Sequence, residues 1–213
     1  MTGAPSAPLS AGTLLYLWGD QVVPAAGRLH RTVTLPSGAV VGAAALAAQV
    51  FAVSVWHLST QRVVRLDAAT RRRLLVLTTD DVGVALVGDP GLRAGYEAAI
   101  LEALTRERTA YGVVRRTFGG YVANPHKMAL KLAVDELPLH GLAQVQDAGR
   151  GFVTGILKGA EEVTFDHVAI RGTWSDFHRL HEAWRGFRDH DPLGGLLVES
   201  CGRAIASREE SGG

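Results

Sequence analysis

Apolar residues recur at three- or four-residue spacing along most of the chain, which places them on one face of an α-helix. This pattern predicts helices in "GTLLYLWGD", in the tract of residues 39–56, in "GDPGLRAGYEAAILEALTRER" and in "NPHKMALKLAVDE". The tract of residues 39–56 approaches membrane-spanning length. It consists mostly of Ala, Val and Gly, and Gln49 and Ser54 interrupt it, so we expect a buried core helix.

A different pattern occupies residues 62–87. The segments "RVVRLD" and "RRRLLVLTTDDVGVALVGD" contain β-branched runs bounded by Asp and Gly, which predicts a β-hairpin. A helix followed by a hairpin is the core of a winged-helix-like unit, and the order recurs where the helix of "NPHKMALKLAVDE" runs into a turn at Gly141 and a strand. The expected fold is therefore mainly α, a compact helical domain with a β-hairpin and winged-helix-like repeats.

The C-terminal part carries an aromatic stripe that should pack on the rest of the protein. Its members recur at helical spacing: Trp174, Phe177, Leu180, Trp184 and Phe187. The following "RDHDPLGG" should break the helix, with Asp191 as N-cap and Pro192 in the first turn of a final helix.

Composition bounds the domain organisation. The 213 residues are 47% hydrophobic, enough to bury a core, and we expect a single domain over residues 13–206. We expect residues 1–12 to be a flexible leader without signal-peptide character, and we expect residues 207–213 to be a disordered tail. Cys201 is the only cysteine, which excludes an intramolecular disulfide and favours a cytoplasmic location.

The chain lacks the motifs of common catalytic sites. It contains no Gly-x-Ser-x-Gly elbow and no phosphate-binding loop, and Cys201 has no sequence-local activating partner. His178 and His181 lie three residues apart, but no further ligand is indicated by a motif, so a metal-dependent enzyme is the weakest reading. We expect no enzymatic activity, no metal and no cofactor.

Basic clusters are the best candidates for a binding surface. Guanidinium groups bind phosphate oxygens in a bidentate manner, and lysine adds a point charge. The candidates lie at the hairpin, at a helix end and on one face of a helix: Arg71, Arg72, Arg73, Arg115, Arg116, Lys127 and Lys131. One such cluster is more often a solvated helix face, but three on one domain favour at least one ligand surface.

The order and spacing of five short segments resemble the Golgi phosphoprotein 3 family, in its actinobacterial branch. These segments cover nearly the whole chain: "LLYLWGD", the Ala-rich tract leading into "RVVRLD", "VGDPGL", "LAVDELPLHGLAQVQ" and "RDHDPLGGLLVE". The resemblance implies a non-enzymatic peripheral membrane adaptor. Eukaryotic members bind phosphatidylinositol 4-phosphate through a tryptophan and arginines, whose positions fall near Val41, Val50, Lys127 and Leu130 here. Because only Lys127 is charged, we expect little preference for that lipid.

Two readings remain open at this point. In the first, the protein is cytoplasmic or peripheral at the membrane and binds anionic lipid headgroups, phosphatidylinositol phosphates among them. A protein partner or a second copy of the chain is a further candidate for binding. In the second, it is a tandem winged-helix module that binds DNA or docks on a protein, with the Lys127 helix near a groove. The net charge of +1 weighs against nucleic acid.

Overall fold

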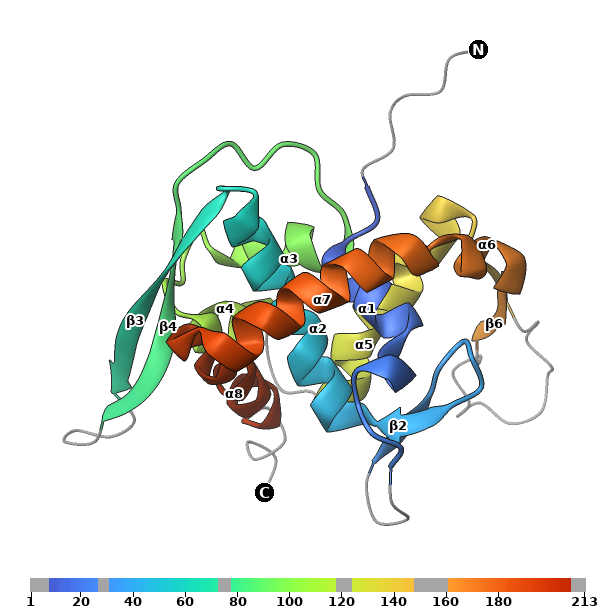
Figure 1. The fold of residues 1–213 in the computed structure, drawn as a ribbon, viewed down its shortest axis with the longest axis horizontal. Coiled ribbons are helices and arrows are strands. Elements are labelled where there is room, and N and C mark those ends of the chain that lie inside the picture. The colour runs from blue at the N-terminus through green and yellow to red at the C-terminus, as the bar shows by residue number, and fades with distance from the viewer. Residues whose placement is uncertain (1–7, 27–30, 73–77, 118–123, 148–160, 208–213) are drawn as a thin grey trace.

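The computed structural model describes residues 8–26, 31–72, 78–117, 124–147 and 161–207 (Figure 1). Helices dominate these residues, which confirms the mainly α fold. The α-helices are α1 (Ala11–Leu17), α2 (Ala43–Thr60), α3 (Gly95–Ala103), α4 (Ala110–Thr117), α5 (Pro125–Glu136), α6 (His167–Gly172), α7 (Trp174–His190) and α8 (Pro192–Ala206), joined by the short 3-10 helices η1 (Gly19–Gln21) and η2 (Leu137–His140).

The strands form antiparallel two-stranded hairpins. They are β1 (Thr32–Thr34) with β2 (Val40–Gly42), β3 (Val64–Arg72) with β4 (Thr78–Leu86), and β5 (Ala143–Asp147) with β6 (Glu161–Phe165). The long β3–β4 hairpin confirms the one expected over residues 62–87, and it projects from the helical body in Figure 1. The β1–β2 pair and β6 have no counterpart among the expected elements.

Helix α2 forms the centre of the core. It packs against α1, α5 and α8, and its residues Leu46, Val50, Phe51 and Leu58 have no solvent exposure. Among the described residues, α2 alone has the length and apolar composition to cross a bilayer, but two thirds of it is buried inside the protein. Its apolar surface is therefore covered by neighbouring helices, as expected of a core helix.

The C-terminal helices form as the sequence indicates. The Asp191 carboxylate accepts a hydrogen bond from the Leu193 N–H at 2.8 Å, and Pro192 is the first residue of α8. In the stripe of α7, Phe177 and Trp184 are buried, while Leu180 and Phe187 are partly buried against the core. Trp174 is the exception, since 43% of it remains exposed.

The N-terminal boundary lies earlier than expected. Ser10 caps α1 by accepting a hydrogen bond from the Thr13 N–H, and Ser10 and Ala11 are almost fully buried. Residues 10–12 therefore do not belong to the flexible leader expected over residues 1–12, because buried polar groups hold this turn in place. Residues 1–7, and the expected tail beyond Ser207, lie outside the described residues.

Candidate functional site

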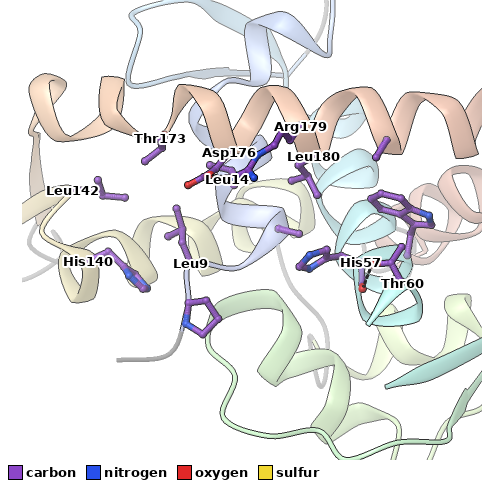
Figure 2. Close-up of a pocket in the computed structure, with 14 residues that line it drawn as sticks. Leu9, Leu14, His57, Thr60, His140, Leu142, Thr173, Asp176, Arg179 and Leu180 are labelled. Carbon is purple, nitrogen blue, oxygen red and sulfur yellow. Dashed lines mark hydrogen bonds and ion pairs between the residues drawn. The ribbon is translucent and has the colours of Figure 1, made fainter. Parts of the chain in front are cut away.

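A cavity of about 640 Å³ lies between α7 and the N-terminal end of α1. Figure 2 shows α7 along one side, Leu9 in the middle, and the imidazoles of His140 and His57 on opposite sides of Leu9. Asp176 and Arg179 of α7 contribute charged groups to the lining. The cavity thus combines apolar walls with a few titratable side chains, which is the usual composition of a small-molecule site.

Glu136, at the end of α5, holds the start of α1. Its side chain is 1% exposed. Its Oε1 accepts a hydrogen bond from the Ser10 N–H at 2.7 Å, and its Oε2 accepts hydrogen bonds from the hydroxyls of Ser10 and Thr13 at 2.6 Å each. His140 Nε2 lies 3.6 Å from Oε1 and links this carboxylate to the cavity.

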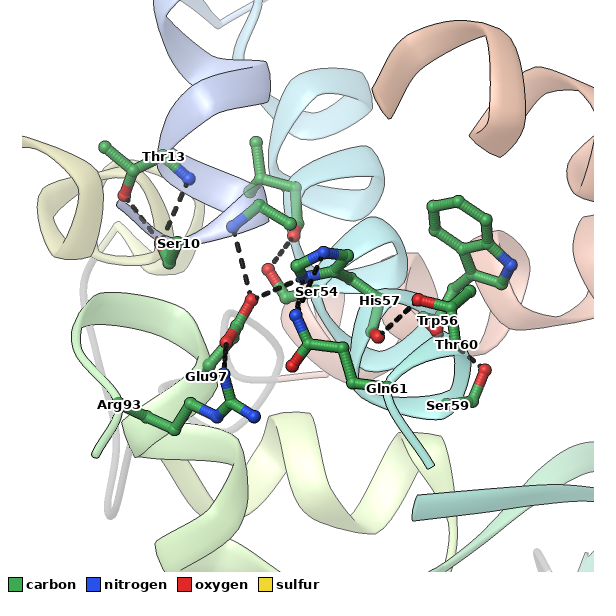
Figure 3. Close-up of polar contacts among 12 residues, drawn as sticks. Ser10, Thr13, Ser54, Trp56, His57, Ser59, Thr60, Gln61, Arg93 and Glu97 are labelled. Atoms are coloured by element: carbon green, nitrogen blue, oxygen red, sulfur yellow. Dashed lines mark hydrogen bonds and ion pairs between the residues drawn. The ribbon is translucent and has the colours of Figure 1, made fainter. Parts of the chain in front are cut away.

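Glu97, on α3, makes a second arrangement of the same kind (Figure 3). Its Oε1 accepts a hydrogen bond from the Ala11 N–H at 3.3 Å and lies 2.8 Å from His57 Nδ1. Arg93 Nη1 lies 3.8 Å from Oε2. The side chain is 4% exposed, so this carboxylate too is buried and paired.

Both carboxylates therefore accept hydrogen bonds from backbone N–H groups at the start of α1. A helix begins with N–H groups that have no partner within the helix, and its N-terminus carries a partial positive charge. Glu136 and Glu97 satisfy two of these donors, at Ser10 and Ala11. Glu97 also forms a hydrogen bond with His57, and Glu136 lies within ion-pair distance of His140, so each imidazole that lines the cavity has a buried carboxylate beside it.

Gly95 makes room for this arrangement. Its φ of +51° lies in the left-handed region, and a Cβ built on it would overlap the Glu136 carboxylate. Glycine is therefore required here both by the backbone and by the space.

The basic residues expected at the hairpin lie away from the cavity. The Arg71 guanidinium carbon sits 3.6 Å from the ring centroid of Tyr111, so β3 and α4 meet through a cation–π contact. Arg72 is exposed, and Arg73 lies outside the described residues. The arginine hairpin thus meets α4 through Arg71.

The arginines of α4 belong to the same region. Arg115 and Arg116 are exposed in its last turn, and Arg115 follows Tyr111 by one helical turn. Arginines near a helix C-terminus also complement the partial negative charge there, so a purely structural role accounts for part of their placement.

Lys127 and Lys131 lie on the outer face of α5. Both are exposed, and Lys131 forms an ion pair with Asp135. The other positions matched to the eukaryotic lipid pocket are in the core: Val41 is 1%, Val50 0% and Leu130 3% exposed. These three side chains cannot reach a headgroup.

The two histidines considered as metal ligands contact aromatic rings. The His181 ring stacks on Phe177 with centroids 5.2 Å apart, and His178 stacks on Trp174 at 6.2 Å. Burial lowers the pKa of His181. Across the described ranges no three His, Cys, Asp or Glu side chains gather as metal ligands would. Cys201 is buried, which raises the pKa of its thiol.

No motif in the sequence indicates the cavity or the two buried glutamates, Glu97 and Glu136, next to it. The available signal was Ser10 with Thr13, because serine and threonine are typical of a helix start. The first turn of α1 has no acidic residue of its own, so an acidic group from elsewhere in the chain can bind there. Comparisons of the chain with protein-family models, with curated proteins and with solved structures found no match. The family resemblance therefore stays a prediction.

Proposed function

We propose that this protein is a non-enzymatic peripheral membrane protein of the cytoplasm that binds anionic lipid headgroups. The binding surface, called here the α5 face, consists of Lys127, Met128, Lys131 and Leu139. The observation that carries the proposal is the exposure of two large apolar side chains on the same α5–η2 segment as two lysines. Met128 is 45% exposed and Leu139 71% exposed.

The α5 face follows from helical spacing. Lys127, Met128 and Lys131 are exposed, whereas Ala129, Leu130 and other residues between them turn into the core. Leu139 belongs to η2, which continues directly from α5. A peripheral protein uses this combination because lysines reach the headgroup charges while apolar side chains enter the boundary below them.

The expected strength is modest. A lysine near an anionic surface contributes about 1 kcal/mol, so two lysines contribute about 2 kcal/mol, or roughly 30-fold in affinity. The ion pair between Lys131 and Asp135 is exposed on both sides, so it weakens the lysine's attraction only in part. Added salt should weaken binding, because the Debye length is about 8 Å at physiological ionic strength.

Vesicle co-sedimentation across a salt series tests the proposal. The wild type should bind phosphatidylserine-containing vesicles at low salt and phosphatidylcholine vesicles weakly or not at all. Lys127→Glu with Lys131→Glu should lower the affinity about 30-fold or more. The thermal midpoint should hardly change, because both side chains are solvated. Phosphatidylinositol 4-phosphate should bind no better than other lipids at equal charge.

A matched control separates a local effect from net charge. Arg65→Glu with Arg185→Glu makes the same change in charge at exposed positions of β3 and α7. This control should retain nearly all of the binding. The proposal fails if the wild type shows no affinity for anionic vesicles at low salt, or if the control loses as much affinity as the α5 variant.

The winged-helix alternative has its own support in the projecting β3–β4 hairpin with Arg71 and Arg72 near its distal end. Duplex DNA titrated into the same samples provides the comparison. Tight DNA binding that Arg72→Glu abolishes, without vesicle binding, would replace the membrane proposal.

A further inference from the structure

The cavity beneath α7 has walls suited to a hydrocarbon chain. Separate elements contribute its apolar side chains: Leu9 and Leu14 from the N-terminal part, Trp56 from α2, Leu142 and Leu180. Figure 2 shows these elements surrounding the space. Its volume of about 640 Å³ lies within the range of roughly 300–1,000 Å³ that ligand sites occupy.

The charged groups that line the cavity already have partners. The Arg179 guanidinium forms an ion pair with Asp176, and His57 lies 2.8 Å from the buried carboxylate of Glu97. The side chains of Arg179 and Asp176 are 79% and 60% exposed, so a charged ligand would meet a solvated ion pair and no unpaired opposite charge. The internal pairing therefore favours an uncharged occupant.

One polar atom is suited to anchor such an occupant. His140 turns Nε2 toward Glu136 at 3.6 Å, and the carboxylate favours the tautomer with its proton on Nε2. Nδ1 is then a hydrogen-bond acceptor, and within the described part of the chain no group bonds to it. His140 lines the cavity, so Nδ1 can accept a hydrogen bond from a hydroxyl of the occupant.

We propose that this cavity binds the hydrocarbon chain of an uncharged lipid alcohol, with the alcohol O–H donating to His140 Nδ1. The site shares no residue with the α5 face, so it extends the proposed function and does not rest on it. A single lipid chain bound in this way lies along the cavity beneath α7, whereas the α5 face meets headgroups at a surface.

Calorimetric titration with three ligands of equal chain length tests the charge argument. 1-Decanol should bind, and decanoate and decylamine should bind about tenfold more weakly or worse, because each carries a charge without a partner in the cavity. Equal or tighter binding of either charged ligand would overturn the assignment of an uncharged occupant. Absence of 1-decanol binding up to its solubility would overturn the site itself.

A filling variant tests the location. Ala183 lines the cavity from α7 and is exposed, so Ala183→Trp should occupy the space without disturbing the core. The affinity for 1-decanol should fall about tenfold or more. Ala44→Trp, at an exposed position of α2 outside the lining, is the matched control and should bind as the wild type does.

The outcomes separate the two proposals. Lys127→Glu with Lys131→Glu should bind 1-decanol as the wild type does, because neither lysine lines the cavity. Failure of vesicle binding with intact 1-decanol binding would leave the cavity assignment standing. Equal 1-decanol affinities of Ala183→Trp and the wild type, measured on samples with the same thermal midpoint, would refute it.

Discussion

Replacing Glu136 should destabilise the protein more than any exposed acidic substitution. Glu136→Ala removes the acceptor of three buried hydrogen bonds, from the Ser10 N–H and from the hydroxyls of Ser10 and Thr13. Each unsatisfied buried donor costs about 1–3 kcal/mol. The Ser10 hydroxyl retains a second contact with Thr13 Oγ1 at 3.0 Å, which offsets part of the loss.

These contributions give a loss of about 3–5 kcal/mol in the free energy of unfolding, from a total that is typically about 5–15 kcal/mol. Glu136→Gln keeps the size and one acceptor oxygen, and the hydroxyls of Ser10 and Thr13 can rotate to accept from the new amide. We therefore expect a smaller loss for Glu136→Gln, about 1–2 kcal/mol. The order of stability should be wild type, Glu136→Gln, Glu136→Ala.

Urea unfolding followed by circular dichroism measures this order. Glu102→Ala is the control, because Glu102 is an exposed glutamate of α3 and its loss should change stability by no more than about 0.5 kcal/mol. A Glu136→Ala variant within about 1 kcal/mol of the wild type would refute the argument that the α1 start depends on this carboxylate.

Further predictions concern a glycine, the cysteine and a histidine. Gly95→Ala should destabilise far more than Gly91→Ala in thermal unfolding, since both have positive φ but only a Cβ at Gly95 meets Glu136; equal losses would contradict this. Burial raises the pKa of the Cys201 thiol, so an aromatic disulfide reagent should label it only after denaturation, and rapid native labelling would show the burial to be wrong. Burial lowers the pKa of His126 in the folded protein. Below about pH 6.5 the unfolded chain therefore binds a proton at this histidine more readily than the folded protein does, and the free energy of unfolding decreases as the pH is lowered. His126→Gln should lessen this loss in urea titrations at several pH values, and an unchanged slope would contradict it.

Much of the local structure could be predicted from the sequence. The helical spacing of apolar residues, the Asp191 cap before Pro192 and the Asp- and Gly-bounded strands all act over a few residues, and each appears in the structure. Helix caps and periodicity depend on neighbours along the chain, so the sequence alone carries this information.

The site depends on contacts that no local pattern encodes. Glu136 is 126 residues from Ser10, and Glu97 is 86 residues from Ala11, yet both carboxylates form hydrogen bonds with the start of α1. A glutamate on an amphipathic helix is usually solvated, and nothing near Glu97 or Glu136 in the sequence distinguishes them from exposed glutamates.

The sequence pattern also does not determine which side chains of a helical stripe remain exposed to solvent. Trp174 and Trp184 belong to one stripe with one spacing, but Trp184 is fully buried and Trp174 is 43% exposed. The sequence determined that both lie toward one side of a helix. The packing of α7 decided which of them is covered, because Trp184 lies over α2, where its indole N–H donates to Gln49, while Trp174 lies at the end of the helix beside Trp18.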